Sequence, residues 1–349
     1  MKKTILTLTI ILLSLGVIGV GVFFFLLTPV NNNEDLTKFT VEEGSSTRSV
    51  ITTLKEEDLI RCEYAALIYV KFNSNYNIKA GTYELSSSYG TMKTLKLLNE
   101  GNTIEKKGVT VTFIEGKRLT YYADVISENF AYTSSEVLAV LSDKAYLNEL
   151  INEYWFITDE ILNENILYPL EGYLYPDTYN FDTDSSIKTI INKLIYTLGT
   201  KIEPYKEEIA NSNYTFHEIL SLASDVEIEG NNEVDRKLIA GIFLRRLDIG
   251  MALGSDVTTY YAVQKNMGEK LYQVDLNSTS LYNTRNSSVM AGKINVGPIC
   301  NPSIMSIVAV LEPTSSDYLY FYADYLGDNT IYYSETYAEH IATVARFEG

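Results

Sequence analysis

Apolar and polar positions alternate with different periods along the chain, and the amino-terminal part is the most apolar. No charged side chain occurs between Lys3 and Glu34, so residues 4–30 form one uncharged stretch. As a helix, this stretch is long enough to cross the ~30 Å hydrocarbon core of a membrane. Lysines before it and acidic residues after it indicate a cytoplasmic amino terminus. We therefore predict a cytoplasmic stub and a transmembrane signal anchor over residues 1–30.

A cleaved signal peptide is the alternative for the same residues. The uncharged stretch is longer than a signal-peptide core, and the following "TPVNNNED" has no small-x-small cleavage site. We therefore expect a single-pass protein of the cell membrane, with its carboxyl-terminal part outside the cytoplasm.

Shorter periods follow over residues 31–108, where the pattern predicts a small βααβα domain with a linker at its end. A strand begins near Phe39 and an amphipathic helix follows it; a second helix covers 61–72, "IKAGTYEL" reads as a strand, and a third helix covers 91–100. The strand–Glu–Gly–helix unit recurs from Val111. "EGNTIEKKG", with glycines near both ends, reads as the linker.

Residues 109–349 are predicted to form a larger mixed domain, so that the fold class of the whole chain is α+β. Helical periodicity predicts helices near 118–129, 134–153, 185–210, 215–229 and 233–248, and a closing helix from Thr336. Short strands are expected at "YLYFYAD" and "TIYYSE".

Charge and composition narrow the classes of ligand. The formal net charge of −17 would repel nucleic acid and anionic lipid, which leaves sugars and proteins as partners of the outer part. With two histidines and no metal-type Cys/His spacing, we expect neither a metal site nor a cofactor. Cys62 and Cys300 could form one bridge, but two buried, small apolar thiols are the simpler interpretation.

The helix predicted from Thr215 ends in a cluster of acidic residues, "ASDVEIEGNNEVD". Thr215 and Glu218 form a capping box at its start, and Gly230 is expected as the C′ residue. On a helical wheel Glu227 falls inside the apolar arc, Asp225 on the polar side and Glu229 at the edge. The acids are either a solvated helix face or include a buried carboxyl group, whose raised pKa would suit a general acid.

The segment "YPLEGYLYPDTYNF" is too rich in Pro and Gly for a long helix and too aromatic for a solvated loop. Two interpretations of its tyrosines are open: they stack on sugar rings, or they pack a folded loop. The residues concerned are Tyr168, Tyr173, Tyr175 and Tyr179.

Six segments of the larger domain carry a resemblance to a known family. They are "LEGYLYPDTYNF" (170–181), "ASDVEIE" (223–229), "RRLDIGMALGSDVTTYYAV" (245–263), "YNT" (282–284), "GPICNP" (297–302) and "YLYFYAD" (318–324). In order and spacing they resemble the MltG/YceG-like endolytic murein transglycosylases. The small domain fits as well, because its "AGTYEL" is similar to the LysM-like module of that family.

The resemblance implies a lytic transglycosylase that cleaves the β-1,4 bond between N-acetylmuramic acid and N-acetylglucosamine within peptidoglycan glycan strands and leaves 1,6-anhydro ends. The family's catalytic glutamate falls on Glu229, against the helical wheel. Glu227, placed among the substrate-binding residues, becomes either a neighbour whose charge raises the pKa of Glu229 or a structural hydrogen-bonding residue. Asp256, Tyr282 and Asn283 are expected either to line the substrate cleft or to be structural. Penicillin-binding proteins and other wall-synthesis proteins are the implied protein partners.

The sequence departs from the family's pattern in three places. Asp256-Val257-Thr258-Thr259 stands where Asp-Pro-Thr-Val is usual, only Gly297, Pro298 and Ile299 match Gly-Leu-Pro-Pro-Gly-Pro-Ile, and Ile331 occupies the place of a histidine. Two further hypotheses follow: a catalytically weak glycan-binding scaffold of the wall-synthesis machinery, and an enzyme that hydrolyses the same bond with water.

Overall fold

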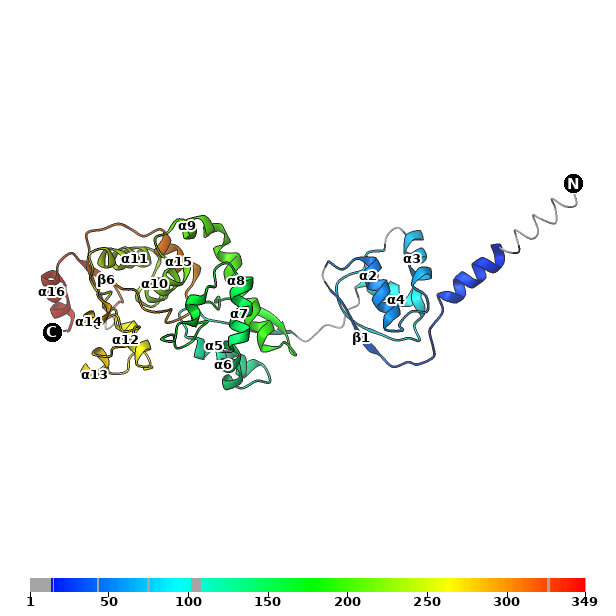
Figure 1. The fold of residues 1–349 in the computed structure, drawn as a ribbon, viewed down its shortest axis with the longest axis horizontal. Coiled ribbons are helices and arrows are strands. Elements are labelled where there is room, and N and C mark those ends of the chain that lie inside the picture. Colours follow the sequence, from blue (N-terminus) through cyan, green and yellow to red (C-terminus); the bar gives the residue numbers. More distant parts are fainter. Residues whose placement is uncertain are drawn as a thin grey trace, which may run out of the picture. The chain divides into compact units, whose positions relative to one another are not determined.

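The computed structural model describes residues 14, 16–42, 44–73, 76–101, 108–324 and 327–348 of the 349-residue chain. The chain divides into two compact units, Met1–Lys107 and Gly108–Gly349 (Figure 1). Among the described residues beyond residue 36, the first holds three helices and two strands, and the second holds the remaining elements.

Residues 16–26 are helical, and most of their apolar side chains are exposed, among them Val17, Ile18 and Phe25. Within the part of the chain that the structure describes, no helix is both long and apolar enough to span a bilayer. Residues 1–13 and 15 of the predicted anchor lie outside the described residues.

The first unit has the βααβα order that the sequence predicts. An antiparallel pair of strands sets Phe39 opposite Tyr83, and both side chains point into a core shared with Ile51, Leu54 and Leu95. The elements are β1 (Thr37–Val41), α2 (Thr47–Glu56), α3 (Glu63–Phe72), β2 (Gly81–Leu85) and α4 (Gly90–Glu100). The likeness of this unit to a LysM module rests on the sequence pattern alone.

The second unit is a mixed α+β assembly in which two small antiparallel sheets, β3–β4 and β5–β6, accompany many helices (Figure 1). In chain order its elements are β3 (Gly108–Thr112), α5 (Leu119–Asn129), α6 (Ser134–Leu141), α7 (Lys144–Glu153), the 3₁₀ turn η1 (Asp159–Leu162), β4 (Thr178–Asp182), α8 (Ile187–Ile202), η2 (Glu203–Tyr205), α9 (Lys206–Asn211), α10 (Phe216–Glu229), α11 (Glu233–Asp248), α12 (Asp256–Ala262), α13 (Gln273–Leu276), α14 (Ser287–Met290), α15 (Ile304–Leu311), β5 (Tyr320–Ala323), β6 (Ile331–Ser334) and α16 (Tyr337–Glu348).

Two predicted helices are interrupted. The stretch 134–153 is two helices, because the Asp143 side chain accepts from the Tyr146 N–H and caps a new helix, α7. The stretch 185–210 breaks into α8, η2 and α9 at Pro204, whose ring cannot continue a regular helix.

Helix α10 lies inside the second unit and is packed by α11, α12 and α15. Its capping box forms as predicted, since Thr215 and Glu218 exchange side-chain and backbone hydrogen bonds. Gly230 is not the left-handed C′ residue expected from the sequence, because its φ is −98°. A Cβ there would lie 2.6 Å from Arg236 Cγ, so Gly230 instead allows α11 to pass close to the end of α10.

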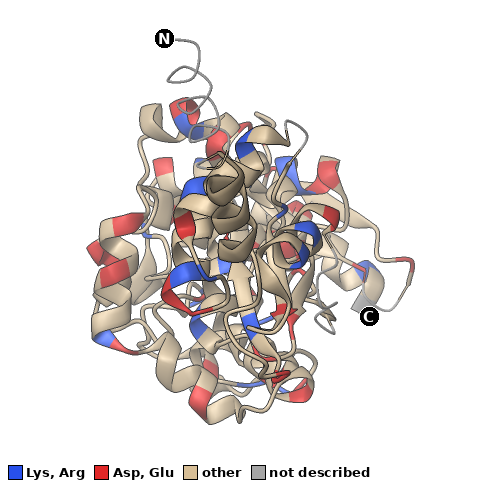
Figure 2. Cartoon of the chain, turned by 90° about the vertical axis from the view of Figure 1, so that its right-hand side faces the viewer, with Lys and Arg blue, Asp and Glu red and all other residues tan. Residues whose placement is uncertain are grey.

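Acidic and basic residues are interspersed along the ribbon (Figure 2). The two thiols are free: Cys300 is buried, whereas Cys62 is half-buried at the start of α3. The single bridge considered from the sequence is therefore absent, and the expectation of two buried thiols holds for Cys300 only.

Candidate active site

Three carboxyl groups lie on the last two turns of α10, and all are buried. Asp225, Glu227 and Glu229 have 0%, 7% and 8% of their surface exposed. The helical wheel was wrong in placing Asp225 on a polar side, because neighbouring helices cover α10 all round. Burial alone therefore does not show which of the three carboxyl groups could act on a substrate. Their hydrogen-bond partners distinguish them.

Both oxygens of Glu227 are occupied by the protein. Oε1 accepts from Arg236 Nη2 at 2.8 Å in a buried ion pair. Oε2 accepts from the Ser303 N–H at 2.9 Å, and from the hydroxyls of Ser303 and Ser306 at 2.6 and 2.7 Å. Glu227 thus joins α10 to α11 and to the first turn of α15, where the helix dipole favours a negative charge. This geometry favours the structural one of its two predicted roles.

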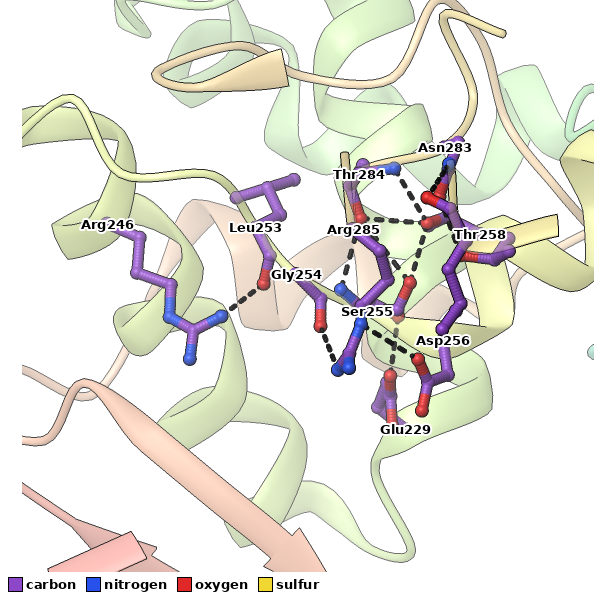
Figure 3. A network of polar contacts seen from close by, with 12 residues as sticks. Glu229, Arg246, Leu253, Gly254, Ser255, Asp256, Thr258, Asn283, Thr284 and Arg285 are labelled. Atoms are coloured by element: carbon purple, nitrogen blue, oxygen red, sulfur yellow. Dashed lines mark hydrogen bonds and ion pairs between the residues drawn. The ribbon is translucent and has the colours of Figure 1, made fainter. Parts of the chain in front are cut away.

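Glu229 has one oxygen held and one open. Oε1 accepts from Ser255 Oγ at 2.6 Å (Figure 3). Among the described residues Oε2 has no hydrogen-bond donor, and it is not one of the fully buried polar atoms that lack a partner. Oε2 therefore keeps access to solvent and is the oxygen that an incoming molecule could meet.

Burial raises the pKa of Glu229 from its usual 4.5 to about 7, against the opposing effect of the Ser255 hydrogen bond. The negative charge of Asp256 also raises this pKa, whereas Arg246 and Arg285 lower it. A carboxyl group in this range holds its proton up to neutral pH and can still release it, which is what a general acid requires.

Asp256 and Arg285 form an ion pair beside Glu229, with Arg285 Nε 3.1 Å from Asp256 Oδ1 (Figure 3). Their side chains are 55% and 45% exposed, so the pair lies at the surface. Asp256 is the predicted site residue that the structure does bring together with Glu229. Arg285 lies outside the motifs that marked candidate site residues in the sequence.

The loop before α12 holds Ser255 against Glu229. Gly254 has a φ of +66°, which favours glycine, and a Cβ at this position would lie 3.0 Å from Arg246 Nη1. Arg246 anchors the loop by donating from Nη1 to the Leu253 carbonyl and from Nε to the Leu319 carbonyl.

Tyr282 and Asn283 are buried, so they contribute no open surface to the site. The Tyr282 ring packs 4.8 Å from that of Tyr261. Asn283 donates to the carbonyls of Leu276 and Ser278, while its own oxygen accepts from Thr259. These contacts favour the structural one of the two interpretations that the sequence left open.

The tyrosines of the "YPLEGYLYPDTYNF" segment pack a folded loop. Tyr173, Tyr175 and Tyr179 are buried in the large core, and Tyr168 packs against it half-buried. The hydroxyl of Tyr173 bonds to His217 Nδ1 at 2.9 Å. None of the three buried rings offers an open face to a sugar.

Glu171 is a rival acid by its pKa, which burial raises to about 8. Its oxygens, however, accept from the Leu119 N–H at 2.7 Å and from the Tyr261 hydroxyl at 3.0 Å. Glu171 is almost completely buried, so it joins α5 to α12 and meets no external molecule.

Asp225 is the least satisfied of the carboxyl groups. Its Oδ1 accepts a long bond of 3.3 Å from Asn295 Nδ2, and Oδ2 is buried with no partner. Burial, reinforced by the nearby charge of Glu229, raises the pKa of Asp225 well above its usual range. Burial therefore favours the neutral form of Asp225 over a wider pH range than for an exposed aspartate.

We expect Asp225→Asn to stabilise the protein at pH 8. An acid whose pKa is higher in the folded state makes folding less favourable once pH exceeds the unfolded pKa of about 4, and the amide removes this cost. The gain should vanish below about pH 3.5, where both forms are neutral. Urea unfolding at pH 8 and pH 3.5 measures it, and a less stable variant at pH 8 would mean that a useful carboxylate had been lost.

A hollow of about 540 Å³ lies near the other end of α10, lined by residues that include His217, Glu218, Lys293 and Asn295. Glu229 is twelve positions beyond His217 on α10, which is about 18 Å along a helix. The hollow does not include Glu229, so size alone does not mark the acid site.

The comparisons with known proteins agree with one another. The sequence profile of the YceG-like family matches residues 39–346. The chain is 35% identical over 326 residues to the endolytic murein transglycosylase of Bacillus subtilis (strain 168), covering 92% of this chain and 88% of that protein. It is 30% identical over 336 residues to a protein of the same name from Streptococcus pneumoniae (strain D39), covering 91% of this chain but only 60% of the relative.

A solved structure is similar as well. The crystal structure of a YceG-like protein from Listeria monocytogenes superposes with a TM-score of 0.63 at 33% sequence identity, covering 89% of this chain and all of that one. The likeness therefore extends across both units.

Proposed function

The chain belongs to the YceG-like family, and from this premise we propose that it is an endolytic peptidoglycan lytic transglycosylase with Glu229 as its acid and base. Two relatives that cover most of the chain carry the name endolytic murein transglycosylase. The observation that carries the proposal is the carboxyl group of Glu229, with a pKa near 7, one oxygen held by Ser255 and the other open.

The chemistry needs a single carboxyl group that acts twice. The acid form of Glu229 protonates the glycosidic oxygen as the bond from C1 of N-acetylmuramic acid breaks. The resulting carboxylate then takes the proton of the 6-hydroxyl, whose oxygen bonds to C1 and closes the 1,6-anhydro ring. Water is not consumed, and Glu229 ends in its starting protonation state.

Glu227 does not share this task, because Arg236 and two serines occupy its oxygens. Asp256 lies beside Glu229 but is paired with Arg285. An ordinary glycosidase needs two carboxyl groups, one on each side of the bond, and the one-carboxyl reaction fits this arrangement better.

Digestion of purified glycan strands tests the proposal. We expect the full-length chain in mild detergent to produce fragments with 1,6-anhydro ends, seen by mass spectrometry. Ends heavier by one water would mean hydrolysis. Binding without cleavage would favour the scaffold hypothesis. That hypothesis was raised because the 285–302 and 326–334 segments depart from the family's pattern.

We further propose that residues 4–30 anchor the protein in the cell membrane, so that the larger unit meets the wall. The uncharged stretch and the exposed apolar side chains of residues 16–26 support the anchor. Protease added to wall-stripped cells should degrade all but a short fragment. Protection of the larger unit would reverse the topology, and release of soluble protein would indicate a cleaved signal.

A further inference from the structure

The hydroxyl groups of two threonines hold the backbone of Ser255 in place. Thr258 Oγ1 donates its single hydrogen to the Ser255 carbonyl at 2.7 Å. It accepts from the Thr284 N–H at 3.1 Å, and the two threonine hydroxyls lie 2.8 Å apart. Thr284 Oγ1 in turn accepts from the Ser255 N–H at 3.1 Å. Both ends of the Ser255 backbone are thus fixed.

The Ser255 hydroxyl is left with one hydrogen and one neighbour, Glu229 Oε1 at 2.6 Å (Figure 3). An ionised carboxylate oxygen can only accept, so Ser255 must donate. The contact lies in the 2.5–2.7 Å range that is typical of a hydroxyl bonded to a carboxylate. When Glu229 is protonated, Oε1 can remain the carbonyl oxygen and keep this bond, while the proton resides on Oε2.

We propose that Ser255 is the positioning residue of Glu229, whose hydroxyl reserves Oε1 as an acceptor and thereby assigns the transferable proton to Oε2, the oxygen open to substrate. The inference rests on the proposed function of Glu229 and adds to it the atom that gives and takes the proton. The same bond orients the carboxyl plane, so that Oε2 stays in place in both halves of the reaction.

Ser255 also stabilises the carboxylate that forms after proton transfer, because its hydrogen bond lowers the pKa of Glu229. The other groups that face Glu229 are Asp225 on α10, Arg246 on α11, Asp256 on α12 and Arg285 ahead of α14. Helix α15, which also packs on α10, contains no titratable residue. Ser255 is the one of these neighbours that bonds directly to Glu229 among the described residues.

Three variants of the full-length chain test the proposal. We expect Ser255→Ala to lower kcat about 10- to 100-fold with little change in KM, since orientation and not binding is lost. In the pH–rate profile of this variant, the loss of kcat on the alkaline side should move to higher pH, because removing the hydrogen bond raises the pKa of Glu229. Ser255→Thr keeps the hydroxyl and should restore both. Thr259→Val is the control, because it removes a buried hydroxyl that bonds to Asn283 but not to Glu229. It should lower the melting temperature and leave the pH–rate profile unchanged.

A readout without turnover separates this inference from the proposed function. The free energy of unfolding is measured against pH for the wild type and for Ser255→Ala, each with and without Glu229→Gln. The difference within each pair reports the folded pKa of Glu229 even in an inactive protein. With Ser255→Ala we expect the midpoint of this pH dependence, which is the folded pKa of Glu229, to rise. An unchanged midpoint, or a Ser255→Ala enzyme with normal kcat, would overturn the role of Ser255. A raised midpoint in a chain that never forms anhydro ends would refute only the proposed function.

Discussion

Glu229→Gln is expected to lower the formation of 1,6-anhydro ends by at least about 10³-fold, to below detection in a strand-digestion assay. General acid–base catalysis contributes ~10² to 10⁴-fold, and here one carboxyl group supplies both the proton and its acceptor. The amide has the same shape and keeps an oxygen for the Ser255 hydrogen bond. The variant should therefore still fold and bind glycan strands while the chemical step fails.

The wild-type enzyme should also lose kcat/KM as pH rises through about 7, because the acid form of Glu229 is then depleted. The raised pKa of Glu229 also makes the stability of the fold depend on pH. Since folding raises this pKa from 4.5 to about 7, Glu229→Gln should stabilise the fold by about 3 kcal/mol at pH 8 and not at all near pH 3.5.

Glu208→Gln is the matched control, because Glu208 is an exposed glutamate on α9. It should keep both activity and the pH dependence of stability. Normal cleavage by Glu229→Gln would place the acid elsewhere, and an inactive variant that no longer binds strands would mean that Glu229 serves binding.

The start of α10 was readable from the sequence, and its surroundings were not. A capping box is local, so Thr215 and Glu218 reveal it without any tertiary information. A helical wheel assumes one buried face and one solvated face. Because α11, α12 and α15 enclose α10, that assumption fails, and Asp225 is buried against the wheel's prediction.

The partners of Glu229 were missed for a related reason. Arg246 and Ser255 lie within the quoted 245–263 motif but carry ordinary side chains, and Arg285 lies outside every quoted motif. Only folding brings the three to one carboxyl group. A glycine immediately before Ser255 is a local sequence signal of a tight loop, and the structure gives Gly254 a left-handed backbone. The order of elements in the first unit and the long helices of the second were predictable from periodicity, but β4, α12 and α15 were not predicted. The breaks at Asp143 and Pro204 depended on capping and ring geometry.

Glu227→Gln is expected to have the largest effect on stability, a loss of about 3–5 kcal/mol, which is typical when one partner of a buried ion pair is removed. Four donors, from Arg236, Ser303 and Ser306, converge on its two oxygens. An amide NH₂ must replace one oxygen and would face at least one of these donors. In either orientation a buried donor loses its acceptor, and the guanidinium of Arg236 loses its counter-charge.

Urea unfolding near pH 7 measures the loss of stability. The digestion assay then measures the cleavage rate of the fraction that remains folded. Because Glu227 bonds only to the protein, we expect the folded fraction of Glu227→Gln to lose less than about tenfold in rate, whereas Glu229→Gln loses about 10³-fold or more. Adding Arg236→Met should recover part of the stability, since it removes the unpaired buried charge. A stable but inactive Glu227→Gln, beside an active Glu229→Gln, would move the acid to Glu227 and show that the helical wheel was the better guide.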